Sequence, residues 1–138
     1  MISSRKLAGA LAALAVAAPT AFAASNVNGT PGNDTLRGTR SADVVMAGAG
    51  NDVVMGFHGR DTLMGQEGAD VLLGGEDADV LMGGQDNDTL MGGKGRDVVL
   101  GQAGDDVLTG GAQRDTLSGG SGDDRIFGGD QADTIYAG

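Results

Sequence analysis

The residues best placed to do chemistry are twelve aspartates that recur every nine residues along most of the chain. The row comprises Asp34, Asp43, Asp52, Asp61, Asp70, Asp79, Asp88, Asp97, Asp106, Asp115, Asp124 and Asp133. Carboxylates repeated within glycine-rich segments offer hard oxygen ligands, and calcium accepts about six to eight such oxygens in irregular geometry. Zinc favours His or Cys, but the chain has only His58 and no cysteine. The row therefore predicts calcium sites.

A nine-residue unit positions these aspartates from Gly29 to Tyr136. Each unit begins with Gly, except at Ala47, and carries Asp at the sixth place and an aliphatic residue at the eighth. The aliphatic row is Leu36, Val45, Val54, Leu63, Leu72, Leu81, Leu90, Val99, Leu108, Leu117, Ile126 and Ile135. The first six places have the composition of turns. The last three, as in Val98–Leu100, favour a very short strand whose middle residue faces the opposite way from its neighbours.

A three-residue strand is not stable alone, so it must pair with similar strands in neighbouring coils. Two units then complete one circuit, and the eighth-place residues of both sheets meet inside. The sequence thus predicts an all-β fold, a parallel β-roll (two-sheet β-solenoid) of twelve nonapeptide repeats over residues 29–138. One aliphatic side chain per unit makes a thin core, and stacked carboxylates repel one another. A second stabiliser is required, and divalent cations between successive turns would supply it.

The array resembles the RTX, or haemolysin-type, calcium-binding nonapeptide repeat, Gly-Gly-x-Gly-x-Asp-x-aliphatic-x. Residues 92–100 and 119–127 match this pattern at every fixed place. The resemblance implies that places one to six form an ion-binding turn, in which the aspartate carboxylate and backbone carbonyls hold calcium between adjacent coils. Six turns on each side would give about ten interior sites. The candidate turn-backbone ligands are Gly32, Gly50, Gly68, Gly92, Gly95, Gly104, Gly119 and Gly122.

The fourth place departs from the pattern differently on the two edges of the expected roll. Because units alternate sides, odd-numbered units share one edge, with Gly32, Gly50, Gly68, Asp86, Gly104 and Gly122 at the fourth place. Even-numbered units share the other, with Ser41, Gly59, Asp77, Gly95, Gln113 and Gln131. If this place needs a positive φ, the odd edge has the better sites and should fill at lower calcium. The alternative is that such turns tolerate Ser, Asp and Gln.

The N-terminus has the order of a secretory signal peptide over residues 1–23. Arg5 and Lys6 precede an apolar run, and Ala21-Phe22-Ala23 is a small-x-small cleavage site. A membrane anchor is the alternative, but the run is shorter than the roughly 20 residues that span a bilayer. We expect a secreted protein with a short mature N-terminal segment, 24–28, and no stable membrane span after cleavage. RTX proteins usually leave the cell through a C-terminal signal, so either export uses this leader or the chain is truncated.

The rest of the sequence bears on partners and catalysis. The formal net charge of −10 disfavours nucleic acid and anionic membranes, and turn residues such as Arg60 and Arg96 are expected to offset local acidity. The ninth place is often Met or Leu and should face outward, where it would serve self-association, a protein partner, or merely β-propensity. No His-Glu-x-x-His, Gly-x-Ser-x-Gly or phosphate-loop motif is present.

The sequence therefore favours a secreted, non-catalytic calcium-binding repeat protein that folds on binding several calcium ions between successive turns. Two alternatives stay open. One is an adhesion or partner-docking module that uses the outward Met/Leu faces. The other is the RTX portion of a truncated secreted hydrolase or toxin.

Overall fold

The computed structural model describes residues 25–138. The predicted signal peptide, residues 1–23, lies outside the described part. Every regular element within it is a strand, so it holds no helix that could cross a membrane. The strands are β1 (Asn26–Asn28), β2 (Thr35–Arg37), β3 (Val44–Ala49), β4 (Val53–His58), β5 (Thr62–Glu67), β6 (Val71–Glu76), β7 (Val80–Gln85), β8 (Thr89–Lys94), β9 (Val98–Ala103), β10 (Val107–Ala112), β11 (Thr116–Ser121), β12 (Arg125–Gly129) and β13 (Thr134–Tyr136).

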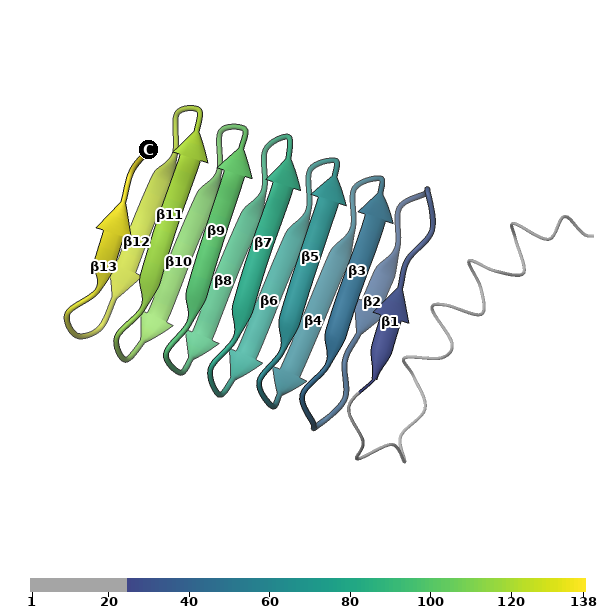
Figure 1. Ribbon diagram of the computed structural model, residues 1–138, viewed down its shortest axis with the longest axis horizontal. Coiled ribbons are helices and arrows are strands. Elements are labelled where there is room, and N and C mark those ends of the chain that lie inside the picture. Colours follow the sequence, from purple (N-terminus) through teal and green to yellow (C-terminus); the bar gives the residue numbers. More distant parts are fainter. Residues whose placement is uncertain (1–24) are drawn as a thin grey trace, which may run out of the picture.

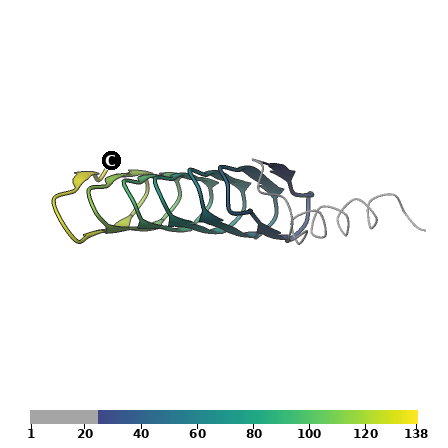
Figure 2. The same cartoon turned by 90° about the horizontal axis from the view of Figure 1, so that it is seen from below.

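The strands form two parallel sheets that face each other along a straight roll (Figures 1 and 2). Sheet A has the order β1-β3-β5-β7-β9-β11-β13, and sheet B has the order β12-β10-β8-β6-β4-β2. Each strand pairs with a strand eighteen residues away, as Val80 does with Val98. Two nonapeptides therefore complete one circuit, and the predicted parallel β-roll is confirmed.

The strands are longer than the sequence pattern indicated. Most contain six residues, which are places seven to nine of one unit and places one to three of the next, as in Val80–Gln85. The expected turn over places one to six is therefore too long, because the structure confines it to places four to six. Glycine has a low strand propensity, but the second-place glycines adopt a positive φ (125° at Gly84) and still pair with the next coil. At the N-terminus, Asn26–Asn28 pairs with β3, so the roll begins before Gly29.

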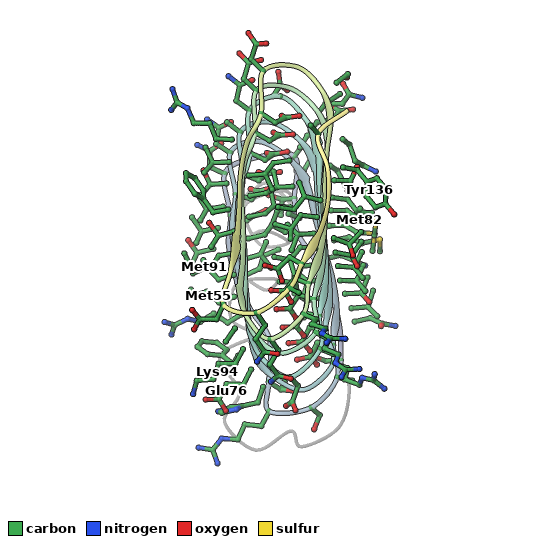
Figure 3. All side chains as sticks on the ribbon, turned by 90° about the vertical axis from the view of Figure 1, so that its left-hand side faces the viewer. Met55, Glu76, Met82, Met91, Lys94 and Tyr136 are labelled. Carbon is green, nitrogen blue, oxygen red and sulfur yellow. The ribbon has the colours of Figure 1, made fainter. Side chains whose placement is uncertain are left out.

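The eighth-place row fills the interior, as predicted. Ten of its members, from Leu36 to Leu117, have at most 1% of their surface exposed. The last two differ, because no further described coil covers them: Ile126 is half-buried and Ile135 is 47% exposed. The view along the roll shows ninth-place side chains pointing outward from both faces, Met82 and Tyr136 from sheet A and Met55 and Met91 from sheet B (Figure 3).

Two rows of turns join the sheets. The odd edge comprises the fourth-to-sixth places of odd-numbered units, such as Gly50–Asp52, which lead from a strand of sheet A to one of sheet B. It runs along the top of Figure 1. The even edge comprises the same places of even-numbered units, such as Gly59–Asp61, and leads from sheet B back to sheet A. The sixth-place aspartates all lie in these two rows of turns.

Candidate metal centre

The aspartate row lies inside the roll rather than on its surface. The nine carboxylates from Asp43 to Asp115 are only 1–2% exposed, and Asp34, Asp124 and Asp133 near the ends are half-buried. Each backbone N–H of the row donates to the carboxylate one coil further on. The Asp79 N–H, for example, lies 2.8 Å from Asp97 Oδ1, and the same bond recurs from Asp34 to Asp115. One oxygen of each acceptor carboxylate is thus committed to holding successive coils together.

The second oxygen of these carboxylates is left without a partner. It is buried and accepts no hydrogen bond in Asp52, Asp61, Asp70, Asp79, Asp88, Asp97, Asp106, Asp115 and Asp124. Except in Asp52, whose unit begins with Ala47, this oxygen faces the first-place glycine of its own unit. A β-carbon on Gly74 would lie 2.5 Å from Asp79 Oδ2 and 2.6 Å from the carbonyl oxygen of Gly92, one coil further on. A carboxylate oxygen and a backbone carbonyl oxygen therefore converge beside the first-place glycine. The space between them is too small for a large side chain, which explains why the first place is Gly in every unit except the one that begins with Ala47.

Burial makes these carboxyl groups hard to ionise in the absence of a cation. Desolvation, and to a smaller extent the charge of neighbouring carboxylates, raise the pKa of Asp79 and Asp88 to about 7, although the backbone N–H bond to each carboxylate lowers it. The same causes raise the pKa of Asp61 and Asp70 to about 6. Such shifts affect both edges alike, because Asp61 and Asp79 belong to the even edge and Asp70 and Asp88 to the odd edge.

The available ligands fit calcium. Among residues 25–138, no three side chains of His, Cys, Asp or Glu converge on a common point. A cation at the unpartnered carboxylate oxygens must therefore complete its shell with backbone carbonyls. Calcium takes carboxylate and carbonyl oxygens together and tolerates irregular geometry, whereas magnesium demands a near-ideal octahedron and zinc prefers His or Cys. A buried carboxylate oxygen without a donor costs free energy, so a bound divalent cation would remove that cost.

The predicted turn glycines fall into two groups. Those at the fourth place lie in the turns, and most of them have a positive φ: Gly50, Gly68, Gly95, Gly104 and Gly122. Gly32 lies in the first turn without one. Gly92 and Gly119 do not lie in turns, because they are first-place residues inside β8 and β11. There they leave room for the Asp97 and Asp124 carboxylates.

The fourth place has a left-handed backbone in every unit except the first two, in which it is Gly32 and Ser41. Four residues other than glycine adopt it there: Asp77 (φ 78°), Asp86 (75°), Gln113 (80°) and Gln131 (78°). Three of these lie on the even edge and one on the odd edge. The second place has the same requirement at Phe57, Gln66 and Gln102, which the sequence reading missed. The recurrence of glycine at the second place was the available signal.

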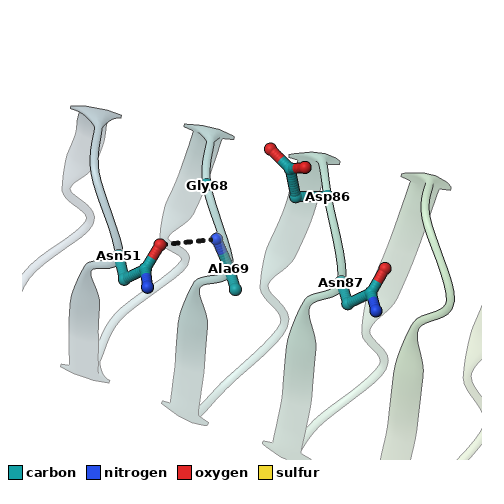
Figure 4. Close-up of a pocket in the computed structure, with 5 residues that line it drawn as sticks. All are labelled: Asn51, Gly68, Ala69, Asp86 and Asn87. Atoms are coloured by element: carbon teal, nitrogen blue, oxygen red, sulfur yellow. Dashed lines mark hydrogen bonds between the residues drawn. The ribbon is translucent and has the colours of Figure 1, made fainter.

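The odd edge carries an outer ladder of hydrogen bonds at the fifth place. Ala69 N–H donates to Asn51 Oδ1 at 3.0 Å, within a hollow of about 380 Å³ that Asp86 and Asn87 also line (Figure 4). Equivalent bonds link Asn51 to Asn33, Asp105 to Asn87, and Asp123 to Asp105. These bonds fix the backbone of the outer turns. On the even edge, an inter-coil bond joins the fourth place instead, from Gly59 N–H to the Asp77 carboxylate at 3.1 Å.

The comparison with known proteins agrees with this geometry. The RTX calcium-binding nonapeptide repeat matches the chain in four copies, at residues 28–56, 55–90, 82–117 and 109–138. No curated protein matches the chain. The matched copies together span the β-roll from Asn28 onwards, including both ladders of buried aspartates. The chain belongs to the RTX calcium-binding nonapeptide repeat family.

Proposed function

We propose that the chain is a secreted, non-catalytic calcium-binding protein whose β-roll folds on binding several calcium ions between successive turns. The observation that carries this proposal is the row of nine buried carboxylate oxygens without a hydrogen-bond partner. Without cations, folding must bury these charges or protonate them at the raised pKa values given above. With calcium in each gap, the same oxygens become ligands, and metal binding contributes directly to the free energy of folding.

Calcium titration of the chain, followed by circular dichroism and hydrodynamic radius, tests this proposal. In a chelator at neutral pH we expect a disordered, expanded chain. Several millimolar calcium should produce β-structure and a smaller radius, whereas magnesium at the same concentration should have a much weaker effect. Unchanged spectra and radius on adding calcium would rule the proposal out.

The absence of catalysis and the secretion of the protein are supported by different features. The sole histidine, His58, lies on the exposed end of β4 and pairs with Glu76 at 3.1 Å. The hollow at Asn51 is shallow and lined by Gly, Ala, Asn and Asp. Secretion is supported by the N-terminal leader sequence, together with family membership. Calcium is abundant outside cells and scarce inside them, so folding on export follows from the same proposal.

A second candidate function is docking of a protein partner, favoured by the composition of sheet A. Its strands carry a single charged side chain, Glu67, whereas sheet B carries Arg37, Glu76, Lys94 and Arg125. A Met64→Lys, Met82→Lys variant on sheet A should remove any concentration-dependent increase in mass seen in calcium. A Met55→Lys, Met91→Lys variant on sheet B is the matched control. A molecular mass equal to that of the monomer at all protein concentrations would exclude self-association.

A further inference from the structure

The two edges of the roll differ sharply in charge. The outer residues of the even edge, taken together with the third-place residues that border it, include five basic ones, Arg40, Arg60, Lys94, Arg96 and Arg114. Three acidic residues accompany them, Glu76, Asp77 and Asp130. The third to fifth places of the odd-numbered units carry no basic residue and four acidic ones, Glu67, Asp86, Asp105 and Asp123. The outer residues along the even edge are therefore net basic, although the chain as a whole is acidic.

Most of this basic charge is not neutralised by neighbouring side chains. Within residues 25–138, the ion pairs join Glu76 to Lys94 at 2.9 Å and to His58 at 3.1 Å, at the end of sheet B (Figure 3). Arg60 and Arg96 line a hollow of about 340 Å³ together with Asp77, yet form no ion pair with any described residue. The Asp77 carboxylate instead accepts the Gly59 N–H. The guanidinium groups of this hollow are thus available to a ligand.

The arginines form a line rather than a cluster. Arg60, Arg96 and Arg114 all occupy the fifth place. Strands in neighbouring coils stack about 4.8 Å apart, so Arg114 lies one coil from Arg96, and Arg60 lies two coils away on the other side. A small anion would reach one or two of these exposed groups and gain little. A linear polymer with an anion on each residue would engage all three, and its contacts would reinforce one another.

Bound calcium determines whether the edge attracts such a polymer, so this inference rests on the proposed function. Directly beneath the even edge lie six row carboxylates, including Asp61, Asp79 and Asp97. In the ionised, calcium-free state their charge exceeds that of the five basic residues. Divalent cations between the coils would offset this inner row, and the outer basic residues would then dominate the even edge. The odd edge gains no positive surface in the same way, because its outer residues are acidic.

We propose that the even edge is a calcium-dependent binding site for a linear acidic polysaccharide, with Arg60, Arg96 and Arg114 contacting its carboxylate or sulfate groups. The third to fifth places of the even-numbered units hold no Phe, Tyr or Trp side chain on which nucleic acid bases would stack. A single column of arginines is also narrow for an anionic membrane surface. An extended sugar polymer with repeated anionic groups suits a line of arginines.

Binding of fluorescent heparin decasaccharide, measured by anisotropy in several millimolar calcium, tests this site. The Arg96→Gln, Arg114→Gln variant removes two members of the line. The Arg37→Gln, Arg125→Gln variant makes the same change in net charge on the outer face of sheet B and is the matched control. We expect about a ten-fold loss of affinity for the first variant and less than about a two-fold loss for the second. A heparin disaccharide should bind far more weakly than the decasaccharide.

Circular dichroism in calcium is recorded for every variant, so that loss of the fold is separated from loss of the site. Equal losses in the two double variants would overturn the proposal, as would undiminished heparin binding in a chelator. Equally tight, arginine-dependent binding of single-stranded DNA or anionic vesicles would overturn the assignment to a polysaccharide. A roll that folds in calcium but does not bind heparin overturns this inference alone. A chain that gains no structure in calcium overturns the proposed function as well.

Discussion

The odd and even edges share one inner ladder but present different outer turns. Beneath both, Asp backbone N–H groups donate to carboxylates one coil away, with equal lengths of 2.8 Å for Asp70 to Asp88 and for Asp79 to Asp97. Outside, the odd edge has glycine at most fourth places and Asn or Asp oxygens that pin the fifth. The even edge has non-glycine residues in the left-handed region, such as Gln113, and basic residues at the surface.

From this difference we predict that calcium affinity depends on more than the sixth-place aspartate. A left-handed φ costs a residue other than glycine on the order of 1–2 kcal/mol. Basic side chains near a cation site also weaken it electrostatically, whereas acidic ones strengthen it. Strain and charge therefore act in the same direction. We expect the odd edge to fill at lower calcium than the even edge, as the fourth-place pattern suggested.

The largest effect should be one that both edges share, the response of the calcium-free chain to acid. Aspartates of both edges have a folded-state pKa of about 6 to about 7, above their ordinary value of 3.8. Their contribution to stability is fully present below the unfolded pKa and is lost as the pH rises through the folded pKa. Circular dichroism in chelator should therefore show β-structure near pH 4 and a disordered chain at pH 8.

Calcium should reverse this trend, because protons compete with it for the same oxygens. The midpoint of the calcium titration should rise as the pH falls below about 6. A calcium-free chain that stays disordered at every pH would show that carboxylate repulsion and desolvation are not what oppose folding.

The next largest effect should separate the edges by removing one carboxylate from each. Asp70 belongs to the odd edge and Asp115 to the even edge, and both are buried with one unpartnered oxygen. Calorimetric calcium titration of Asp70→Ala should show a tight-binding component weakened about ten-fold or more, as expected when a charged ligand is lost. Asp115→Ala should retain that component and lose part of the weaker one. If both variants lose the same component, the edges are equivalent.

A smaller effect should follow from relieving strain on the even edge. Gln113 has a φ of 80°, so Gln113→Gly should stabilise the calcium-bound roll by about 1 kcal/mol. Thermal unfolding in saturating calcium measures the gain. Gln85→Gly is the control, because Gln85 lies at the exposed end of β7 and is not among the residues with positive φ. A similar gain in both variants would mean that strain does not distinguish the edges.

The smallest effect should come from the outer ladder of the odd edge. Asn51→Ala removes the acceptor of the Ala69 N–H and should cost about 0.5–1 kcal/mol, since the bond is exposed. Faster hydrogen exchange at the Ala69 amide, with a modest weakening of the tight calcium component, is the expected result. Asn33→Ala repeats the test one coil earlier, at the Asn51 amide. Unchanged hydrogen exchange at both amides would show that the outer ladder does not contribute to the difference between the edges.

The fold could be predicted in detail from the sequence because two nine-residue units correspond to one coil of the roll. A nonapeptide with one inward aliphatic residue, such as Leu81, permits few arrangements other than two strands per circuit. The strand extension through Gly83 and Gly84 was not predicted, because glycine ordinarily weakens strands and local propensity carries no information on pairing between coils. The exposure of Ile135 was missed because an end coil has the same local pattern as an interior one.

The candidate site was predicted less completely. The twelve aspartates and several turn glycines were identified, but the burial of the aspartate carboxylates inside the roll was not predicted. Side-chain direction at the sixth place does not follow from strand alternation, because that place lies in a turn. The bonds from Asp79 N–H to Asp97 and from Ala69 N–H to Asn51 likewise join residues eighteen apart. Such contacts depend on how neighbouring coils are aligned, and this alignment cannot be predicted from the pattern of a single nine-residue unit.

The two-unit circuit has a consequence for how such a chain tolerates changes in length. Gain or loss of eighteen residues adds or removes one whole coil and leaves every downstream turn on its own edge. Gain or loss of nine residues keeps the repeat intact but moves every downstream turn to the opposite side. Arg96 and Arg114 would then join the odd-numbered series, and Asp105 and Asp123 the even-numbered one. An insertion or deletion therefore preserves the difference between the two edges only when it contains an even number of nonapeptide units.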